Sequence, residues 1–335
     1  MKIPRSIIAL LSVVAWWALL GEPLSAYLKF GFSVNGRVVT VKWNRTPVQY
    51  FVNERGESGV TATAFADALA AAFRTWEAVP SASIRYQFGG FTSSMPLVEE
   101  GRTTIGFVAA PELERVLAST SLLFDEGTGE LIEADIFFNS AFLWSTAAAG
   151  EAGRFDVETV ALHEIGHLNG LGHSAMGETE IGIGGRRVLA AEAAMFPLAY
   201  GPGNAMHRSL RADDIAGISD LYPDGDFDER TGSISGRVTK NGSGLFGAHV
   251  VAFNPATGAM VGNFSLNGNG SFSIAGLTGG PHILRVEPLD DADVESFFVA
   301  STVLDLDFRA MFHDRVVVAP PGGDSGAIEL RVVPK

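Results

Sequence analysis

Hydrophobic and polar residues alternate in several short stretches of the first 140 residues. Such stretches, rich in β-branched and aromatic side chains, are typical of strands. The last two flank the sequence DEGTGE, a glycine-containing turn that predicts a β-hairpin. The six predicted strands are residues 38–43, 48–52, 83–88, 103–108, 116–124 and 131–138.

Three other stretches have the periodicity of amphipathic helices. Residues 61–79 carry apolar side chains at three- and four-residue spacing and end before Pro80. A second helix is predicted to begin near Asp156, whose carboxylate suits the N-cap, and to run to Gly170. Residues 211–222 form the third. Strands and helices mix without regular βαβ alternation, which indicates an α+β domain.

The pattern changes after about residue 223. An acidic, glycine-containing stretch reads as a linker, and short alternating segments separated by NGSG, NPATG, NGNG and TGG follow it. No helical period is present there, so we expect a small all-β sandwich. The predicted organisation is a signal peptide (1–26), an α+β domain (27–223), a linker (224–232) and a β-sandwich (233–335).

The N-terminus has the features of an export signal. Lys2 and Arg5 precede an apolar run over residues 6–20, and small residues close it at Ser25 and Ala26. Fifteen apolar residues are fewer than the roughly 20 needed to span a bilayer. We therefore expect cleavage after Ala26 and a secreted, periplasmic or extracellular protein; an uncleaved N-terminal anchor is the alternative.

The composition of the chain limits the kinds of partner and the sources of stability that we expect. The formal net charge is −14 and no basic run occurs, which argues against nucleic acid as a partner. The chain has no cysteine, so its stability must come from core size and from any bound metal.

The sequence HEIGHLNGLGHS contains three of the seven histidines. In a helix His163 and His167 point the same way, and Glu164 lies at the edge of that face. Glycine at position 170 lets the helix end and the chain turn back, which brings in His173. Three imidazoles with one open position are typical of a catalytic zinc site. Incidental histidines on one helix are the alternative.

HEIGHLNGLGH resembles the extended zinc-binding pattern of the metzincin metallopeptidases, and the following Ser174 is similar to the matrixin branch. The resemblance extends from about Val38 to Tyr222. It implies a zincin fold, with a twisted mixed sheet and three helices, and a methionine turn beneath the zinc. Met195 and Pro197 match that turn, although Phe196 stands where matrixins usually have tyrosine. Asp213 and Asp214 are expected to brace it.

The resemblance implies a secreted zinc-dependent endopeptidase. A zinc-activated water would attack the peptide bond, with Glu164 as general base and then general acid. An extended peptide or protein substrate would pair with the edge strand at residues 116–122, and residues 174–194 would supply part of the pocket wall. No cysteine is available to hold the zinc in a latent form.

Two further metal predictions follow from the comparison with animal matrixins. Since no histidine lies within residues 1–162, the second, structural zinc of those enzymes is expected to be absent. Glu133, Asp135 and Asn139 offer oxygen ligands that could hold a structural calcium ion. A solvated strand end explains these three residues equally well.

The C-terminal segment is similar to carboxypeptidase regulatory-like domains, which are transthyretin-like sandwiches. Such domains are usually non-catalytic and would attach to a surface or polymer. The remaining histidines have no ligand spacing and are expected to be exposed or hydrogen-bonded: His207, His249, His282 and His313.

Two rival functions remain. The chain could be a secreted adhesion or binding protein built on a non-catalytic zincin scaffold, but Glu164 and all three histidines are present. A serralysin-like enzyme would have tyrosine at the position of Pro197 and calcium-binding repeats, and neither occurs.

Overall fold

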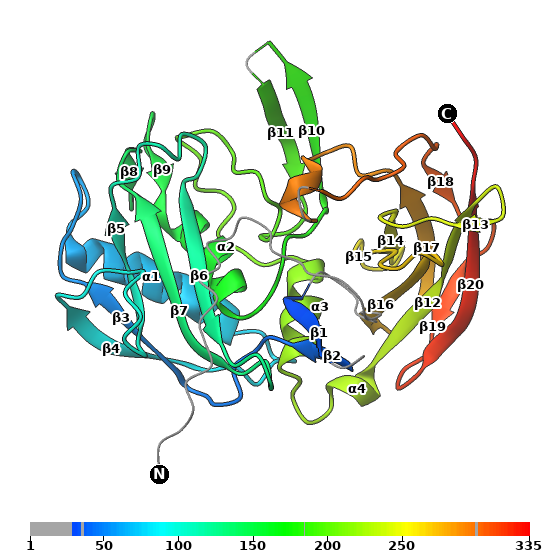
Figure 1. Cartoon of the computed structure of the whole chain (residues 1–335), viewed down its shortest axis with the longest axis horizontal. Coiled ribbons are helices and arrows are strands. Elements are labelled where there is room, and N and C mark those ends of the chain that lie inside the picture. Colours follow the sequence, from blue (N-terminus) through cyan, green and yellow to red (C-terminus); the bar gives the residue numbers. More distant parts are fainter. Residues whose placement is uncertain (1–28, 35–36, 184, 299–300) are drawn as a thin grey trace.

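The computed structural model describes residues 29–34, 37–183, 185–298 and 301–335 (Figure 1). The predicted signal peptide, residues 1–26, lies outside these residues. None of the helices in the described ranges combines the length and apolar character that a membrane crossing requires.

A five-stranded sheet forms the body of the N-terminal region. Its strand order is β4-β3-β5-β7-β6, and all neighbours are parallel except β6, which runs antiparallel to β7 at the edge. The β6–β7 pair is the predicted hairpin. The strands are β3 (Val48–Asn53), β4 (Tyr86–Thr92), β5 (Thr103–Val108), β6 (Ala118–Phe124) and β7 (Leu131–Asn139).

Helix α1 (Ala62–Glu77) begins where the Thr61 hydroxyl accepts a hydrogen bond from the Ala64 amide. Its apolar stripe is buried, as predicted: Phe65, Leu69, Phe73 and Trp76. This stripe packs against the sheet and against helix α2 (Val157–Leu168), which in turn contacts β6 and β7. The helix that carries HEIGH is therefore fixed from both sides.

Four short strands form two further pairs near the sheet: β1 (Gly31–Val34) with β2 (Arg37–Thr40), and β8 (Trp144–Ser145) with β9 (Phe155–Asp156).

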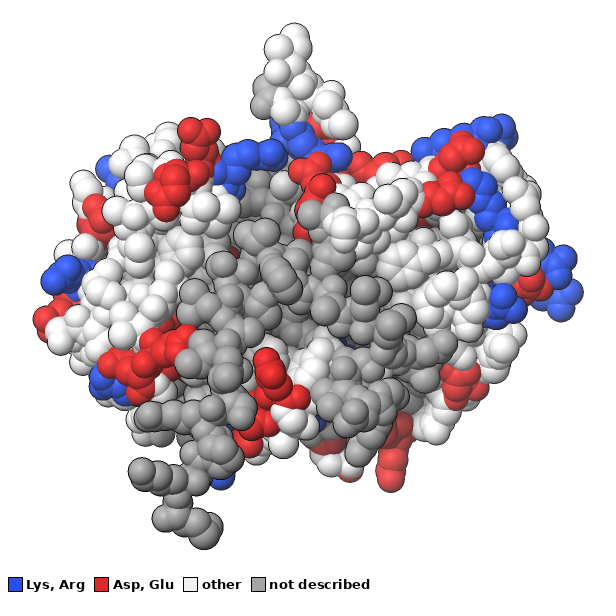
Figure 2. Space-filling model, in the orientation of Figure 1, with Lys and Arg blue, Asp and Glu red and all other residues white. Residues whose placement is uncertain are grey.

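A hairpin that the sequence pattern did not predict projects from the body (Figure 1). It consists of β10 (Gly177–Gly182) and β11 (Gly185–Ala191). Ile181 and Ile183 are exposed near its tip. Lys and Arg side chains gather around its base, whereas Asp and Glu are scattered over much of the same face (Figure 2).

The predicted linker is structured instead of extended. Its residues include a short helix, α4 (Phe227–Arg230), and strand β12 already begins at Thr231. Phe227 is buried, and Arg230 forms ion pairs with Asp224 and Asp226. Because these acidic residues have a cationic partner and an apolar anchor beside them, the segment folds although its composition resembles a linker.

Two sheets make up the C-terminal region. β20 and β16 flank β12 in one sheet, with β13 also pairing with β12; in the other, β14 lies between β15 and β17, and β17 also pairs with β18 and β19. Buried side chains from both sheets belong to one core cluster. The elements are β12 (Thr231–Lys240), β13 (Ser243–Gly244), β14 (His249–Phe253), β15 (Met260–Phe264), β16 (Ser271–Thr278), β17 (Gly280–Glu287), the 3-10 turn η1 (Val294–Ser296), β18 (Met311–Phe312), β19 (Val317–Ala319) and β20 (Asp324–Val332).

The two regions share packing. Helix α3 (Ala212–Leu221) contacts both β15 and β16. A Cβ atom added at Gly276 of β16 would lie 3.0 Å from the Cβ of Ala216 on α3, so the helix and the strand are in close contact. Ala216 and Ile218 belong to the same buried cluster as the sandwich residues Ile234 and Ile274. The molecule therefore has a core that continues from one region into the other.

Candidate metal centre

Helix α2 begins and ends where the sequence predicts. The Asp156 side chain caps its N-terminus by accepting from the Thr159 amide at 2.8 Å. At the other end Gly170 has φ = +97°, a conformation that glycine adopts readily. A Cβ at this position would lie 2.3 Å from the carbonyl oxygen of Val41. The chain can therefore turn sharply here only because residue 170 has no side chain.

This turn brings the three histidines of the motif together. The Nε2 atom of His167 lies 3.1 Å from Nε2 of His163 and 3.2 Å from Nε2 of His173. All three candidate ligand atoms lie within 4.8 Å of one another. Zn–N bonds of about 2.05 Å in a tetrahedral arrangement separate the nitrogens by about 3.3 Å. The spacing of these atoms therefore fits zinc.

The opposite ring nitrogens explain why the Nε2 atoms face one another. Each Nδ1 lies within hydrogen-bonding distance of a backbone carbonyl: His163 at 2.8 Å from Ala194, His167 at 2.8 Å from Leu171, and His173 at 2.6 Å from Ser296. Since a carbonyl only accepts, each Nδ1 carries the proton and each Nε2 presents a lone pair.

Three lone pairs this close repel one another without a cation between them. Burial lowers the pKa of all three imidazoles, that of His173 to about 3, so protonation does not relieve the repulsion near neutral pH. The donor set therefore fits a divalent metal, and His163, His167 and His173 would hold it.

Glu164 is held beside the histidines by a residue that the sequence analysis did not single out. The Thr120 hydroxyl on β6 lies 2.6 Å from Oε2 of Glu164 and 3.0 Å from its backbone carbonyl oxygen. Both residues are buried, and burial raises the pKa of Glu164 to about 7. A carboxyl with a pKa near neutrality can both accept and release a proton at physiological pH. Nothing in the sequence pattern distinguishes Thr120 from other inward-facing strand residues.

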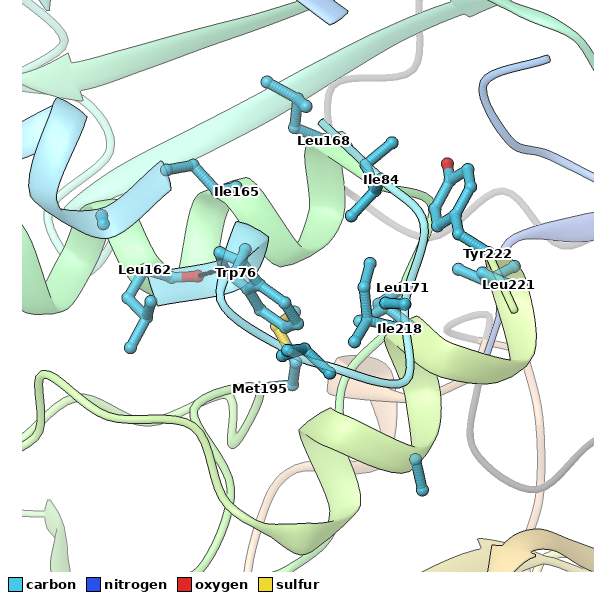
Figure 3. Packing of buried hydrophobic residues seen from close by; sticks show 14 of the residues in the cluster. Trp76, Ile84, Leu162, Ile165, Leu168, Leu171, Met195, Ile218, Leu221 and Tyr222 are labelled. Atoms are coloured by element: carbon cyan, nitrogen blue, oxygen red, sulfur yellow. Dashed lines mark hydrogen bonds between the residues drawn. The ribbon is translucent and has the colours of Figure 1, made fainter. Parts of the chain in front are cut away.

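Met195 lies beneath the histidine helix, next to the indole of Trp76 (Figure 3). The Trp76 ring is itself fixed, because its Nε1 donates to the carbonyl of Leu162 at 2.8 Å. Gly166 on α2 faces the methionine, and a Cβ there would lie 2.0 Å from the sulfur. The Met195 side chain therefore fills the space that Gly166 of α2 leaves open.

The aspartate pair divides into two roles. Asp214 accepts from the amides of Ala194 and Met195 at 2.8 and 3.1 Å, and so braces the methionine turn as expected. Asp213 reaches the same turn through Ser174: its carboxylate accepts from the Ser174 hydroxyl at 2.6 Å, and the Ser174 amide donates to the Met195 carbonyl at 2.9 Å. Its other oxygen accepts from the Gly262 amide of β15 at 2.8 Å. Successive helical side chains point about 100° apart, which is why the two neighbours have different direct partners.

The histidines open into a cleft of about 480 Å³. One wall comes from Arg115 to Ala118 at the start of β6, and the other from Ala193 to Gly201, including Pro197. The prediction that residues 174–194 form the wall holds only at its end, because residues 177–190 form the projecting hairpin. A hairpin pairs its own backbone groups and so can leave the body of the domain.

The lining of the cleft also includes three phenylalanines, Phe142, Phe155 and Phe196. His207, which the sequence left isolated, also lines it and stacks on Tyr200 with ring centroids 3.9 Å apart. Sequence spacing could not reveal this pairing, since neither residue belongs to a helix or strand.

The oxygen ligands considered for calcium bind backbone amides. Glu133 accepts from the amides of residues 100, 101 and 102, and Asp135 accepts from those of Leu97 and Thr104. Asn139 likewise accepts from the Ala110 amide. These side chains of β7 therefore hold two backbone segments, residues 97–104 and the chain at residue 110. Among the described residues, the one group of three or more His, Cys, Asp or Glu side chains close enough to share an ion is the three-histidine group.

The remaining histidines lie in the sandwich. His249 is buried, with Nδ1 3.0 Å from Glu287, and His282 is buried with Nδ1 3.0 Å from the Gly280 carbonyl. His313 lies 3.6 Å from the carboxylate of Asp314.

A three-histidine site that opens into a cleft beside a carboxylate is of the kind used by metal-dependent hydrolases. Comparison with known families agrees with this geometry. Residues 42–223 match the matrixin family (Peptidase_M10), and the match covers more than half of the 335 residues. The chain belongs to the matrixin family. Membership of this family supports the assignment of the protein as a metalloprotease.

A shorter similarity points the same way. A stretch of 74 residues, 21% of this chain, is 42% identical to metalloendoproteinase 5-MMP from Arabidopsis thaliana. The alignment covers 16% of that relative's length.

Proposed function

We propose that this protein is a secreted zinc-dependent endopeptidase. The observation that carries the proposal is the convergence of three unprotonated Nε2 atoms beside Glu164, at the floor of an open cleft. A zinc ion bound there supplies a Lewis acid that polarises the peptide carbonyl and acidifies a water molecule.

The protein's own groups handle the proton. Glu164 takes a proton from the attacking water and returns it to the departing amine. Thr120 holds one carboxylate oxygen, so the other is left to face the cleft. The backbone carbonyls on Nδ1 keep the three imidazoles in the tautomer that exposes Nε2.

The substrate we propose is an extended polypeptide. β6 is one of the two edge strands of the five-stranded sheet, so a peptide backbone can pair with its outer edge, and the residues just before it line the cleft. The phenylalanines in the lining of the same cleft suit a large apolar side chain of the substrate. Backbone pairing tolerates many sequences, so this pocket would set most of the preference.

Export and the role of the sandwich are also part of the proposal. The apolar run at residues 6–20 supports secretion, to the periplasm or beyond the cell. Attachment of the C-terminal region to a surface or polymer rests on its resemblance to carboxypeptidase regulatory-like domains.

The decisive experiment measures zinc content and cleavage of a mixed peptide library, with and without chelator. We expect about one zinc per chain and cleavage that the chelator abolishes and added zinc restores. Glu164→Ala should keep the zinc and lose at least 100-fold in kcat, the usual scale of general acid–base catalysis being about 10²–10⁴-fold. Full zinc occupancy without chelator-sensitive cleavage would favour the adhesion protein instead.

A further inference from the structure

The three carbonyls that accept from the Nδ1 atoms of the histidines do not come from the same part of the chain. Ala194 and Leu171, which accept from His163 and His167, belong to the matrixin region. Ser296, which accepts from His173 at 2.6 Å, lies 123 residues further on, in the 3-10 turn of the C-terminal region. The third ligand is therefore oriented by a different structural unit from the first two.

The residue after Ser296 makes a second contact with the same ligand. The ring of Phe297 is 4% exposed and lies edge-on to His173, with centroids 6.2 Å apart. On its other side it packs on Phe264 of β15, at 5.3 Å. Phe297 thus connects the histidine to the framework of the sandwich.

Further contacts hold the turn in this position. Asp291 accepts from the Thr179 amide of β10 at 2.7 Å, and Arg186 of β11 donates to the carbonyl of Asp290 at 2.8 Å. Ala175, two residues after His173, is buried in one cluster with Phe264, Phe297 and sandwich residues around them. The loop that carries His173 and the turn that carries Ser296 are therefore packed as one unit.

A separate set of contacts involves Ser174, the residue that follows the ligand His173. The Asp213 carboxylate accepts from the Ser174 hydroxyl and from the Gly262 amide of β15. Asp213 is buried, so both hydrogen bonds are shielded from water. Polar and apolar contacts thus join the His173 loop to the same strand, β15.

We propose that the C-terminal sandwich is a structural part of the metal centre, holding His173 as a ligand through the Ser296 carbonyl and the Phe297 ring. Without them the Nδ1–H of His173 loses its acceptor, and the imidazole can change tautomer and turn away from the metal. Groups that hold the second ring nitrogen of a zinc-bound histidine typically contribute about 10- to 100-fold in metal affinity. This proposal rests on the zinc site of the proposed function.

The test compares two full-length variants, Phe297→Ala and Phe298→Ala. Phe298 is a matched control: its ring also packs on Phe264, at 5.1 Å, and on Phe246, at 5.3 Å, within the same cluster. Zinc affinity is measured by competition with a chromogenic chelator, and ligand geometry by the visible spectrum of the cobalt-substituted protein.

We expect Phe297→Ala to raise the zinc Kd about tenfold or more, the scale known for groups that orient a ligand, and to alter the cobalt spectrum. Phe298→Ala should stay within about twofold of wild type, since it removes similar packing but no contact with His173. Equal effects in the two variants, or a wild-type Kd in Phe297→Ala, would overturn the proposal.

A third variant covers the case in which Phe297→Ala does not fold. Asp291→Ala removes the side-chain hydrogen bond to the Thr179 amide of β10 without emptying the core, and should raise the Kd by a smaller factor. An unchanged Kd in that variant would then overturn the proposal. If the wild-type chain itself bound no zinc, the proposed function would fail, which is a distinct outcome.

Discussion

At the scale of single residues, the site is organised by hydrogen bonds to groups outside the five residues HEIGH. HEIGH places His163, Glu164 and His167, but the tautomer of each imidazole is set by a backbone carbonyl outside these five residues: that of Leu171 for His167, and those of Ala194 and Ser296 for His163 and His173. The direction of the Glu164 carboxylate is likewise set by Thr120, 44 residues earlier. The motif supplies the chemical groups, and the fold supplies their orientation.

Thr120→Val tests the orientation of Glu164. Valine has nearly the shape of threonine, so the substitution removes the hydroxyl and little else. A hydrogen bond to a charged group contributes about 1.5–3 kcal/mol, so we expect kcat to fall at least about tenfold. Zinc affinity should not change. Thr120→Ser keeps the hydroxyl and should retain most of the activity; a fully active Thr120→Val enzyme would show that the contact has no role.

Asp135 predicts a dependence of stability on pH. Burial raises the pKa of this carboxyl to about 7 in the folded state, against its ordinary value of 3.8 when unfolded. The folded state therefore binds the proton more tightly. The resulting stabilisation is complete below about pH 4 and is lost as the pH rises through about 7.

The measurement is urea unfolding of the metal-free protein at pH 5 and pH 7. The free energy of unfolding of wild type, relative to that of Asp135→Asn, should be lower at pH 7 than at pH 5, because the variant lacks only this carboxyl and keeps the other buried titratable groups. Asp67→Asn, which changes an exposed carboxylate on α1, is the control and should behave as wild type. An unchanged pH dependence in Asp135→Asn would rule out this residue as its source.

At the scale of elements, the sequence pattern predicted the helices of the core better than the exposed segments around them. Helices α1, α2 and α3 lie within one or two residues of the predicted bounds, because buried stripes and caps are local signals. The β10–β11 hairpin was missed: its strands are largely exposed, so no buried face repeats every second residue. Because this hairpin was missed, the cleft wall was predicted at residues 174–194, whereas the residues that line the cleft lie mainly within 193–201.

Gly170 is the position where the turn after α2 depends on one residue. Gly170→Ala would place a methyl group 2.3 Å from the Val41 carbonyl oxygen, in a backbone conformation that alanine avoids. Gly153 is the matched control, since it also has positive φ (+77°) but open space where a Cβ would lie.

We expect Gly153→Ala to cost about 1–2 kcal/mol of folding stability, the usual penalty for a left-handed non-glycine residue. Gly170→Ala should cost more, because steric overlap adds to the strain, and it should weaken zinc binding by displacing His173. Chemical unfolding and chelator competition measure both effects. Equal stability losses and unchanged zinc affinity would mean that the turn adapts to a side chain.

At the scale of the whole molecule, the two predicted domains are less separate than composition indicates. The acidic stretch taken for a linker contains α4, α3 packs on β15 and β16, and buried residues of both regions belong to one cluster. A sequence pattern reports which face of an element is buried but not against which partner. The sandwich could therefore be expected from its strands, whereas its contact with the His173 loop could not.

A shared core predicts that zinc stabilises the sandwich as well as the site. Zinc at 100 times its Kd adds about 2.7 kcal/mol to the stability of any unit that must unfold to release it. If the two regions unfold together, amides of β12 and β16 should gain as much protection from hydrogen exchange as those of α2. His167→Ala removes a ligand and should abolish the gain in both regions. A gain confined to α2 and the His173 loop would show that the regions open independently, because a sandwich that unfolds alone without releasing zinc gains nothing from the metal.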